Sequence, residues 1–568
     1  MKKSISIVLS LIIIFSTVSF AFAAADDDAP GIAVASDLHY NVPRENLEHD
    51  IDDDIYFYAN RRAAMEDESG FIIDEFLRQC ADNDDIQYVF ISGDLADNGR
   101  TSLREHTDIA EKLKKFESET GKSVFVCNGN HDTGASADDI TNEKFRDIYY
   151  EFGYNEALET QEGTLSYTVN IGNKYRLIVG DSCDPSVSTE DGLTFDRVTW
   201  ICNQAKKAKS EGRYPLLMMH HNLLDHMPLQ RILSHNFIVR NHELTAERFV
   251  DSGIRLVFTG HEHCSDVASF TSSLGNKIYD FSTTSLTMFP LSYRFVKLGN
   301  EEITYKECKI NSIDYAGLYN TVEGYTDEQK KLMQADFADY SKGFFKAGIK
   351  YRLWLGLTPE KLGIDEDAFY ADVVYTAVNG LLDVLETPYY GEQGLKYKAA
   401  EYNIDLPETG YINGWDLATE LVAYHYAGDE PFAMDSPEVT LLLRTADYIL
   451  LDVLSSVNDE VFLKAANDIS SNFGTGSLCK DFTKAAAKVA GPVTAGEYMI
   501  VAIASPLLYG LAYDRDGIPD NNGSLKGYDS DDSGFTALSE KITTSVNRFF
   551  INLKLFFSYI LKIFLPEC

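Results

Sequence analysis

Short apolar runs alternate with longer amphipathic stretches over residues 31–310 of this 568-residue chain. A short apolar run bounded by turn residues predicts a buried strand, whereas apolar positions at helical spacing predict a helix. Strands that alternate with helices are typical of an α/β domain built in layers. The predicted strands are 32–35, 86–91, 124–127, 177–179, 216–219, 256–258, 278–281, 293–296 and 300–309, and the clearest predicted helices are 68–80 and 101–116.

The pattern changes near residue 314, where strand-like runs give way to apolar residues at helical spacing. We therefore expect an all-α domain over residues 313–512, after an α/β domain over residues 24–312. Residues 513–535 are rich in Asp, Asn, Ser and Gly, a composition that favours an acidic linker. The helices predicted within the all-α domain are 326–345, 365–385, 418–427, 439–457 and 464–490.

The amino terminus has the three parts of an export signal. Lys2 and Lys3 precede an apolar run at 5–22, and Ala21-Phe22-Ala23 has the small-x-small form of a cleavage site. We expect residues 1–23 to be a signal peptide and the protein to be exported, as a secreted or cell-surface protein. The alternative is an uncleaved membrane anchor, which would also carry the body of the chain out of the cytoplasm.

The carboxyl-terminal segment 536–568 is predicted to be an amphipathic helix. Residues 548–565 are strongly apolar, but Lys554 and Lys562 make the segment too short and too charged to span a membrane easily. Such a helix can lie at a membrane surface, which would give the protein a peripheral membrane contact. A helix packed against its own domain fits the same pattern, and the sequence leaves both interpretations open.

Charge restricts the classes of partner. The chain has 88 acidic and 50 basic residues, which give a formal net charge of −38. This field repels nucleic acid, so we expect no nucleic-acid binding. An anionic substrate must be attracted by a local positive charge, such as bound metal ions. The eight cysteines include no Cys-x-x-Cys pair, which argues against a thiolate zinc site.

Five polar motifs each follow an apolar run directly. Because ligands bind outside the carboxyl ends of strands in open α/β sheets, we expect these motifs to lie at one edge. Their His, Asp and Asn side chains are nitrogen and oxygen ligands of the kind that bind Zn, Mn, Fe and similar ions. A carboxylate has two oxygens and can bridge two ions. The motifs are Asp37-Leu38-His39, Gly93-Asp94-Leu95-Ala96-Asp97-Asn98, Gly129-Asn130-His131-Asp132, His220-His221 and Gly260-His261-Glu262-His263.

In this order the motifs resemble those of the calcineurin-like metallophosphoesterases, whose pattern is DxH, GDxxD, GNH(D/E), H and GHxH. The resemblance covers about residues 31–300 and includes every ligand position. It implies a layered α/β fold, with a β-sheet sandwich flanked by helices, that holds two divalent ions of Mn, Zn or Fe. It further implies that Asp94 bridges the ions, that Asp37, His39, Asp94 and His263 hold one ion, and that Asp94, Asn130, His220 and His261 hold the other.

The resemblance also assigns roles to side chains beside the ligands. His220 directly ends its strand and matches the ligand, whereas His221 is expected to line the pocket. His131 resembles the histidine that protonates the leaving oxygen, and Asp97 resembles the carboxylate that orients its imidazole. A structural histidine beneath the loop is the alternative for His131. Asp97 stands where purple acid phosphatases have a tyrosine ligand, so a coloured ferric centre is not expected.

The sequence therefore predicts an exported metal-dependent phosphoesterase that hydrolyses phosphate mono- or diesters with a metal-bound hydroxide as nucleophile. Exported sphingomyelinase-like members of the family also join this catalytic domain to a helical region, which favours phospholipid or cell-envelope substrates by analogy. An extracellular nucleotidase is the alternative enzyme. A metal-stabilised surface module without activity is the other alternative, although the intact ligand set, with His131 and Asp97 beside it, argues against it.

Overall fold

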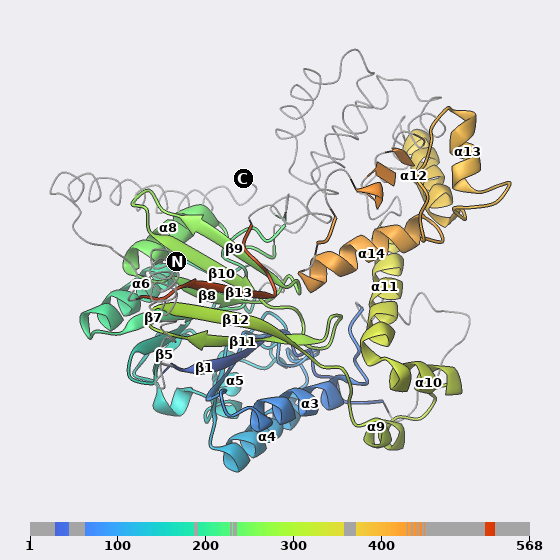
Figure 1. The fold of residues 1–568 in the computed structure, drawn as a ribbon. Helices are drawn as coiled ribbons and strands as arrows, with labels where there is room; N and C mark the ends of the chain where they lie inside the picture. The colour runs from blue at the N-terminus through green and yellow to red at the C-terminus, as the bar shows by residue number, and fades with distance from the viewer. Residues whose placement is uncertain are drawn as a thin grey trace, which may run out of the picture.

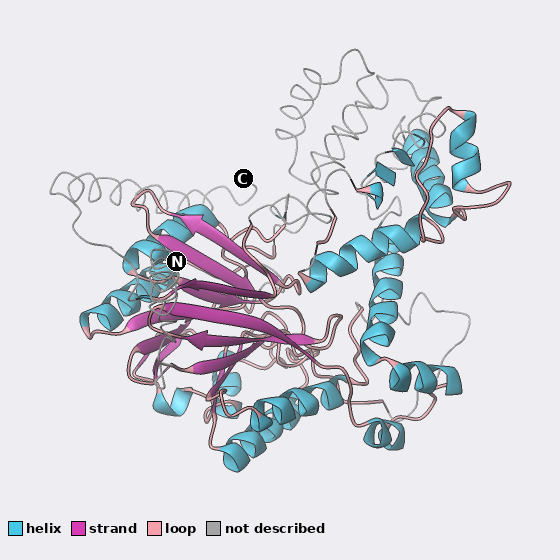
Figure 2. Ribbon diagram, viewed as in Figure 1, coloured by secondary structure: helices cyan, strands magenta, loops and turns pink. Residues whose placement is uncertain are grey.

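The computed structural model describes residues 29–44, 63–186, 191–227, 230, 236–356, 371–428, 430–432, parts of 436–448 and 517–528. The predicted signal peptide 1–23 and the predicted carboxyl-terminal helix 536–568 lie outside these residues. Two mixed β-sheets lie face to face, and helices cover their outer faces (Figures 1 and 2). The predicted α/β sandwich flanked by helices is therefore confirmed.

The first sheet has the strand order β13-β12-β11-β1-β2-β3. Its centre consists of the three parallel strands that the apolar runs predict, and the antiparallel strands β11 and β12 extend it on the β1 side. The bounds are β1 Gly31–Ala35, β2 Tyr88–Ile91, β3 Ser123–Val126, β11 Ser292–Leu298 and β12 Glu302–Lys309. All five strands overlap the predicted ranges.

The second sheet has the strand order β4-β5-β6-β7-β8-β10-β9. Strands β6, β7, β8 and β10 are parallel, and β5 and β9 pair antiparallel at either side of them. The sequence predicted the four parallel strands but not β4, β5 and β9. The bounds are β4 Glu159–Thr160, β5 Tyr167–Ile171, β6 Tyr175–Val179, β7 Tyr214–Met218, β8 Leu256–Thr259, β9 Asp266–Thr271 and β10 Lys277–Ser282.

Side chains that alternate along each strand form two packed layers. Phe258 of β8 faces the first sheet, where its ring lies 5.9 Å from that of Phe90 on β2. Its neighbour Val257 faces the opposite way, into the apolar cluster beneath α6 and α8. Because successive side chains point to opposite faces of a strand, both faces of β8 are buried. The covering helices are α3 Ser69–Asp82, α4 Leu103–Thr120 and α5 Asn142–Ile148 on the first sheet, and α6 Phe195–Ser210 and α8 His242–Ser252 on the second.

Further helices follow β12 and extend from one end of the sandwich (Figure 1). The sequence predicts one helix over 326–345, but the structure has two, with a break at Asp336. The Asp336 carboxylate accepts a hydrogen bond from the Asp339 N–H at 2.9 Å, so it caps the second helix instead of continuing the first. The bounds are α9 Tyr315–Thr321, α10 Asp327–Ala335, α11 Phe337–Gly356, α12 Ala371–Glu386, α13 Leu395–Glu401 and α14 Gly414–Ala427.

None of the helices in the described part of the chain is both long and apolar enough to cross a membrane. The predicted helix 464–490 lies outside the described residues, as does most of 439–457.

The segment predicted as a linker contains the strand β13, Asn522–Lys526, which pairs antiparallel with β12. The linker prediction is wrong for residues 522–526, where tertiary contacts outweigh a turn-like composition. Gly523 lies against Tyr305, and a Cβ atom at this position would overlap the tyrosine hydroxyl. The buried Arg294 donates to the carbonyl of Asp520, whose carboxylate accepts from the Val267 N–H at 3.1 Å. The helices between β12 and β13 are thus an insertion into the sandwich domain, which we call the helical insertion.

Candidate metal centre

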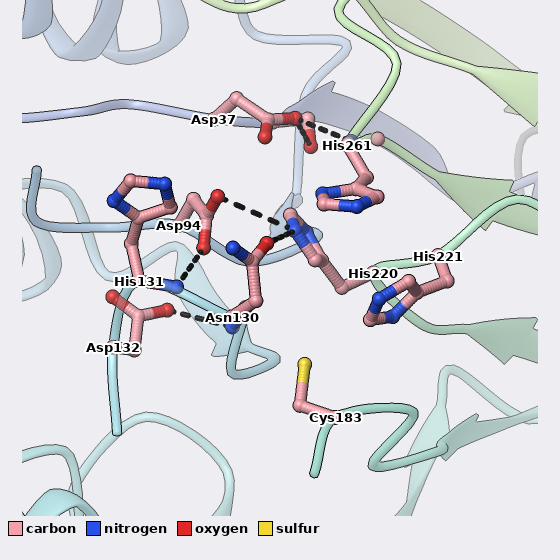
Figure 3. Close-up of polar contacts among 12 residues, drawn as sticks. Asp37, Asp94, Asn130, His131, Asp132, Cys183, His220, His221 and His261 are labelled. Atoms are coloured by element: carbon pink, nitrogen blue, oxygen red, sulfur yellow. Dashed lines mark hydrogen bonds and ion pairs between the residues drawn. The ribbon is translucent and has the colours of Figure 1, made fainter. Parts of the chain in front are cut away.

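The loops that follow β1, β2, β3, β7 and β8 bring the predicted metal ligands together, and Figure 3 shows five of them: Asp37, Asp94, Asn130, His220 and His261. Three overlapping sets of side chains among the described residues offer ligand atoms that lie within 4.8 Å of one another, and His39, Asp94 and His131 form the set that shares a member with each of the other two. The first set is Asp37, His39 and His263, which we call the Asp37 group. The second is Asp94, His220 and His261, together with Asn130, whose Oδ1 lies 2.9 Å from His220 Nε2. We call this second set the His220 group.

Asp94 lies between the two groups. Its Oδ2 atom is 3.3 Å from Nε2 of His220 and 3.8 Å from Nε2 of His39. Its other oxygen accepts a hydrogen bond from the His131 backbone N–H at 2.8 Å. One carboxylate therefore faces both sets of imidazoles, while a backbone donor fixes its orientation.

The backbone at the ligands is unusual. Positive φ angles occur at Asp37 (49°), His39 (39°), Asp94 (47°), His261 (67°) and His263 (64°). For a residue with a Cβ atom, a positive φ costs roughly 1–2 kcal/mol of conformational energy. Residues with such angles cluster where function requires a particular geometry. The tight turns aim successive side chains at one point, which straight strand ends would not do.

Glycines in the motifs allow the loops to approach one another. A Cβ atom on Gly129 would overlap the carboxylate of Asp94, and one on Gly260 would overlap the hydroxyl of Ser36. Gly93 has φ 105° and lies against the ring of His220. These three positions therefore require glycine for close packing of backbone against ligand.

Three ligand imidazoles have a partner at Nδ1, which leaves Nε2 directed at the centre. His39 Nδ1 lies 3.0 Å from Oδ1 of Asp97, and His220 Nδ1 donates to the carbonyl of Ser92 at 3.0 Å. His263 Nδ1 lies 3.1 Å from the thioether sulfur of Met288. Metal-bound histidines in proteins are held in this way, through the ring nitrogen that does not bind the ion.

His261 is held by stacking. Its ring lies against Phe237 with centroids 4.3 Å apart and an interplanar angle of 26°. Its backbone N–H donates to Asp37 Oδ2 at 3.0 Å, which links the two groups. Nε2 of His261, Oδ1 of Asp37 and Nδ1 of His39 are buried and make no hydrogen bond, although His263 Nε2 lies 3.2 Å from Asp37 Oδ1 and Asp97 Oδ1 lies 3.0 Å from His39 Nδ1.

The electrostatics of these side chains suit a cation. Burial alone raises the pKa of Asp94, but His220 and His131 outweigh burial and hold that pKa well below its ordinary value. Burial, reinforced by His221 and His220, lowers the pKa of His261 well below its ordinary value. An ionised carboxylate beside a neutral imidazole is the state in which both bind metal. Burial lowers the pKa of His220, but Asp94 outweighs burial and raises it to about 9, so an ion that binds there displaces the proton of this imidazole. Because buried ligand atoms without a hydrogen-bond partner also point into the site, the residues present fit a metal centre.

The sequence predicts that the Asp97 carboxylate orients the His131 ring. The structure shows a main-chain contact between the two residues, in which Nδ1 of His131 donates to the backbone carbonyl of Asp97 at 2.7 Å. The Asp97 carboxylate faces His39 and also accepts from the Asn41 side-chain amide at 3.2 Å. The sequence could not distinguish a contact through the carboxylate from a contact through the backbone carbonyl, because both groups belong to Asp97. Asp97 thus touches His131 with its main chain and a predicted metal ligand with its side chain.

The structure separates the two adjacent histidines. His220 lies among Asp94, Asn130 and His261, whereas His221 Nδ1 lies 3.0 Å from the hydroxyl of Ser182. The His221 ring borders His261, with centroids 4.5 Å apart. His221 therefore lies beside the His220 group without facing Asp94.

Several residues that support the site have no role predicted from the sequence. Asp132 accepts hydrogen bonds from the backbone N–H groups of Gly129 (2.7 Å), Leu95 (2.9 Å) and Ala96 (3.2 Å), which ties the loops after β2 and β3 together. Its place in the Gly129-Asn130-His131-Asp132 motif was the available signal. Phe237 and Met288 gave none, because only the folded chain brings them to the histidines.

Comparison with known proteins identifies the domain. The family model of the calcineurin-like phosphoesterases matches residues 31–265, the segment that carries all five motifs. Residues 31–265 belong to the calcineurin-like phosphoesterase family. This domain is thus a metal-dependent phosphoester hydrolase, and the family implies divalent metal ions. No curated protein matches the chain.

Solved structures that resemble the phosphoesterase domain are distant. A dimetal phosphatase from Danio rerio is 12% identical, with a TM-score of 0.35, over 50% of this chain and 96% of its own. A predicted phosphoesterase from Streptococcus pneumoniae is 13% identical, with a TM-score of 0.19, over 50% and 90%. The phosphopantetheinyl hydrolase of Mycobacterium tuberculosis is 12% identical, with a TM-score of 0.25, over 45% and 90%. None of these likenesses identifies a substrate.

Proposed function

We propose that this protein hydrolyses phosphate mono- or diesters at a centre of two divalent ions, one held by the Asp37 group and one by the His220 group. The position of Asp94 carries this proposal, since a single carboxylate oxygen lies within 4 Å of an imidazole nitrogen from each group. When bound, a pair of ions activates water and neutralises charge at phosphorus during in-line displacement.

His131 is suited to transfer a proton to the leaving oxygen. A carbonyl can only accept, so the contact with Asp97 places a proton on Nδ1 of His131. The transferable proton is then the one on Nε2, and the carbonyl stabilises the imidazolium that carries it. The side chain is half-buried beside His39, with ring centroids 4.9 Å apart, so it lies at the centre and still reaches solvent.

The activity is tested with p-nitrophenyl phosphate and bis-p-nitrophenyl phosphate, using protein that has been reloaded separately with Mn, Zn or Fe. Turnover of either ester that depends on added metal is the expected result. The preferred ester then decides between monoesterase and diesterase. Two bound ions without turnover by any metal would overturn the proposal and favour the metal-stabilised surface module.

We further propose that the enzyme acts outside the cytoplasm, on phospholipid or cell-envelope esters. The apolar run at 5–22 and the Ala21-Phe22-Ala23 site support export. Fractionation of expressing cells, with amino-terminal sequencing, should find an exported chain that begins at Ala24. A full-length cytoplasmic chain would contradict this. A screen of phospholipids, envelope polymers and nucleotides tests the substrate class, and a clear preference for nucleotides would favour the nucleotidase.

A further inference from the structure

The histidine ligands of the two groups differ in the atom that holds Nδ1. His39 has a carboxylate oxygen of Asp97 at 3.0 Å, and His220 has the carbonyl oxygen of Ser92 at 3.0 Å. His263 instead has the sulfur of Met288, at 3.1 Å. A thioether is a weak acceptor, much weaker than a carboxylate or a carbonyl.

The acceptor at Nδ1 affects metal binding through the ring. A strong acceptor polarises the Nδ1–H bond and raises the basicity of Nε2, which makes the histidine a better ligand. Sulfur provides little of this, so His263 is a weaker imidazole donor than His220, whose Nδ1 makes a hydrogen bond to a carbonyl. It is also the most accessible, since 21% of its side chain is exposed, compared with 3% for His39 and none for His220.

The helical insertion holds Met288 in place. Met288 is 1% exposed and packs in an apolar cluster with Phe345 and Ile349 of α11 and Ala423 of α14. The next residue, Phe289, contacts the Phe345 ring at 6.0 Å between centroids. Two helices that lie outside residues 31–265, together with Ala63 and Ala64, therefore surround the side chain that contacts His263.

The same insertion also reaches the chain that follows His263. The backbone N–H of Ser265 donates to the carbonyl of Tyr426, near the end of α14, at 3.0 Å. The ring of Tyr426 packs on Phe345, with centroids 4.9 Å apart. His263 is thus bounded by the helical insertion both at its ring, through Met288, and at its backbone, through Ser265.

We propose that Met288 is a positioning residue that keeps the ion of the Asp37 group weakly held, and that the helical insertion imposes this property on the centre. The inference rests on the two-metal centre proposed above. This role of Met288 makes the two ions differ in binding affinity. The ion in the Asp37 group exchanges readily, whereas the ion in the buried His220 group is retained.

The test measures stepwise Mn²⁺ binding by calorimetry on metal-free protein. Wild-type protein should bind two ions with separate Kd values, and the weaker step should disappear in His263→Ala. Met288→Gln supplies an amide oxygen in nearly the same volume, so it should tighten the weaker step about tenfold and leave the other unchanged. Met288→Leu removes the acceptor and keeps the packing, so it should weaken that step severalfold.

Met333→Leu is the matched control. Met333 is also a buried methionine whose sulfur accepts a hydrogen bond, from the Tyr319 hydroxyl at 3.6 Å, but it lies in α10 and in a different cluster. Both Kd values should stay at the wild-type values in this variant. Thermal unfolding of each variant verifies the fold independently of metal.

The outcomes separate the two proposals. Two ions bound by wild-type protein, with the weaker Kd unchanged in both Met288 variants, would overturn the role of Met288 and leave the metal centre standing. A wild-type protein that binds no more than one ion would overturn the two-metal centre, and the role of Met288 with it.

Discussion

The Asp37 group and the His220 group use the same types of side chain in different surroundings. In the His220 group the imidazoles are buried, and they are fixed by a backbone carbonyl and by the stacked ring of Phe237. In the Asp37 group, His263 is partly exposed and rests on the sulfur of Met288. The sandwich domain supplies the ligands of both groups, but the methionine beside His263 packs against helices added to the sandwich.

This difference shows how an addition to a fold can adjust a centre without supplying a ligand. The ligands of both groups come from loops of the phosphoesterase domain, but Met288, which contacts the ligand His263, packs against α11 and α14. We expect changes at Asp94 to affect both groups, and changes at Asp97 or Met288 to affect only one.

The largest effect is expected for Asp94→Asn. Removing the charge that both groups share should weaken the binding of both ions. Because the ions contribute several kcal/mol to catalysis, activity should fall at least about 1,000-fold. Steady-state kinetics together with metal analysis measures this. Asp74→Asn is the control, since Asp74 is an exposed carboxylate paired with Lys112 on the helical surface. Loss of only one ion in Asp94→Asn would mean that Asp94 belongs to a single group.

The next largest effect is expected for His131→Asn. Both ions should remain bound, because the side chain of His131 acts on the leaving oxygen, and kcat should fall about 100-fold for an alkyl ester. The loss should be smaller for p-nitrophenyl esters, whose leaving group needs little protonation. An equal loss for both kinds of ester would instead indicate the structural histidine.

Asp97→Asn tests which of the two histidines the Asp97 carboxylate supports. Its carboxylate contacts His39, so the variant should weaken the ion of the Asp37 group about tenfold and leave the ion of the His220 group unchanged. The contact of its carbonyl with His131 should survive. If metal binding were normal and the kinetics matched those of His131→Asn, the carboxylate would act on His131 after all.

The smallest effect on turnover, but a measurable effect on stability, is expected for His226→Gln. Buried His226 lies 2.5 Å from Asp266 and 3.1 Å from Asp280, which accepts from the Leu223 and Leu224 N–H groups. This arrangement anchors the loop that follows the double histidine. Loss of one partner of a buried ion pair costs about 3 kcal/mol.

The pH dependence of this cost follows from the pKa. Burial alone lowers the pKa of His226, but the carboxylates of Asp280 and Asp266 raise it from 6.5 to about 10. Because the pKa is higher in the folded state, the stabilisation is complete below pH 6.5 and is lost as the pH rises through 10. Urea unfolding of metal-free wild type and His226→Gln should therefore give free energies that differ at pH 6 and converge above pH 10. A constant difference would contradict the ion pair.

Sequence was sufficient for the features that depend on local pattern. The parallel strands appear as apolar runs, and the ligands follow them because the carboxyl ends of such strands meet at one edge. Whether each predicted ligand binds metal remains a prediction, but the structure places all of them around Asp94.

Contacts between distant parts of the chain were not predictable. Nothing near Met288 indicates that it meets His263, since the packing of the helical insertion brings them together. β13 was mistaken for linker because an edge strand held by Tyr305 and Arg294 needs few apolar residues of its own. The positive φ angles of the ligands likewise arise from the loops closing on one another.

The most direct test of the centre is the electron paramagnetic resonance spectrum of metal-free protein loaded with two equivalents of Mn²⁺. Two ions held by the two groups and bridged by Asp94 would lie roughly 3.5–4 Å apart, close enough for their spins to couple. We expect the signal of a coupled pair in wild-type protein and its loss in Asp94→Asn. A spectrum of isolated Mn²⁺ in the wild-type protein would contradict a shared two-metal centre.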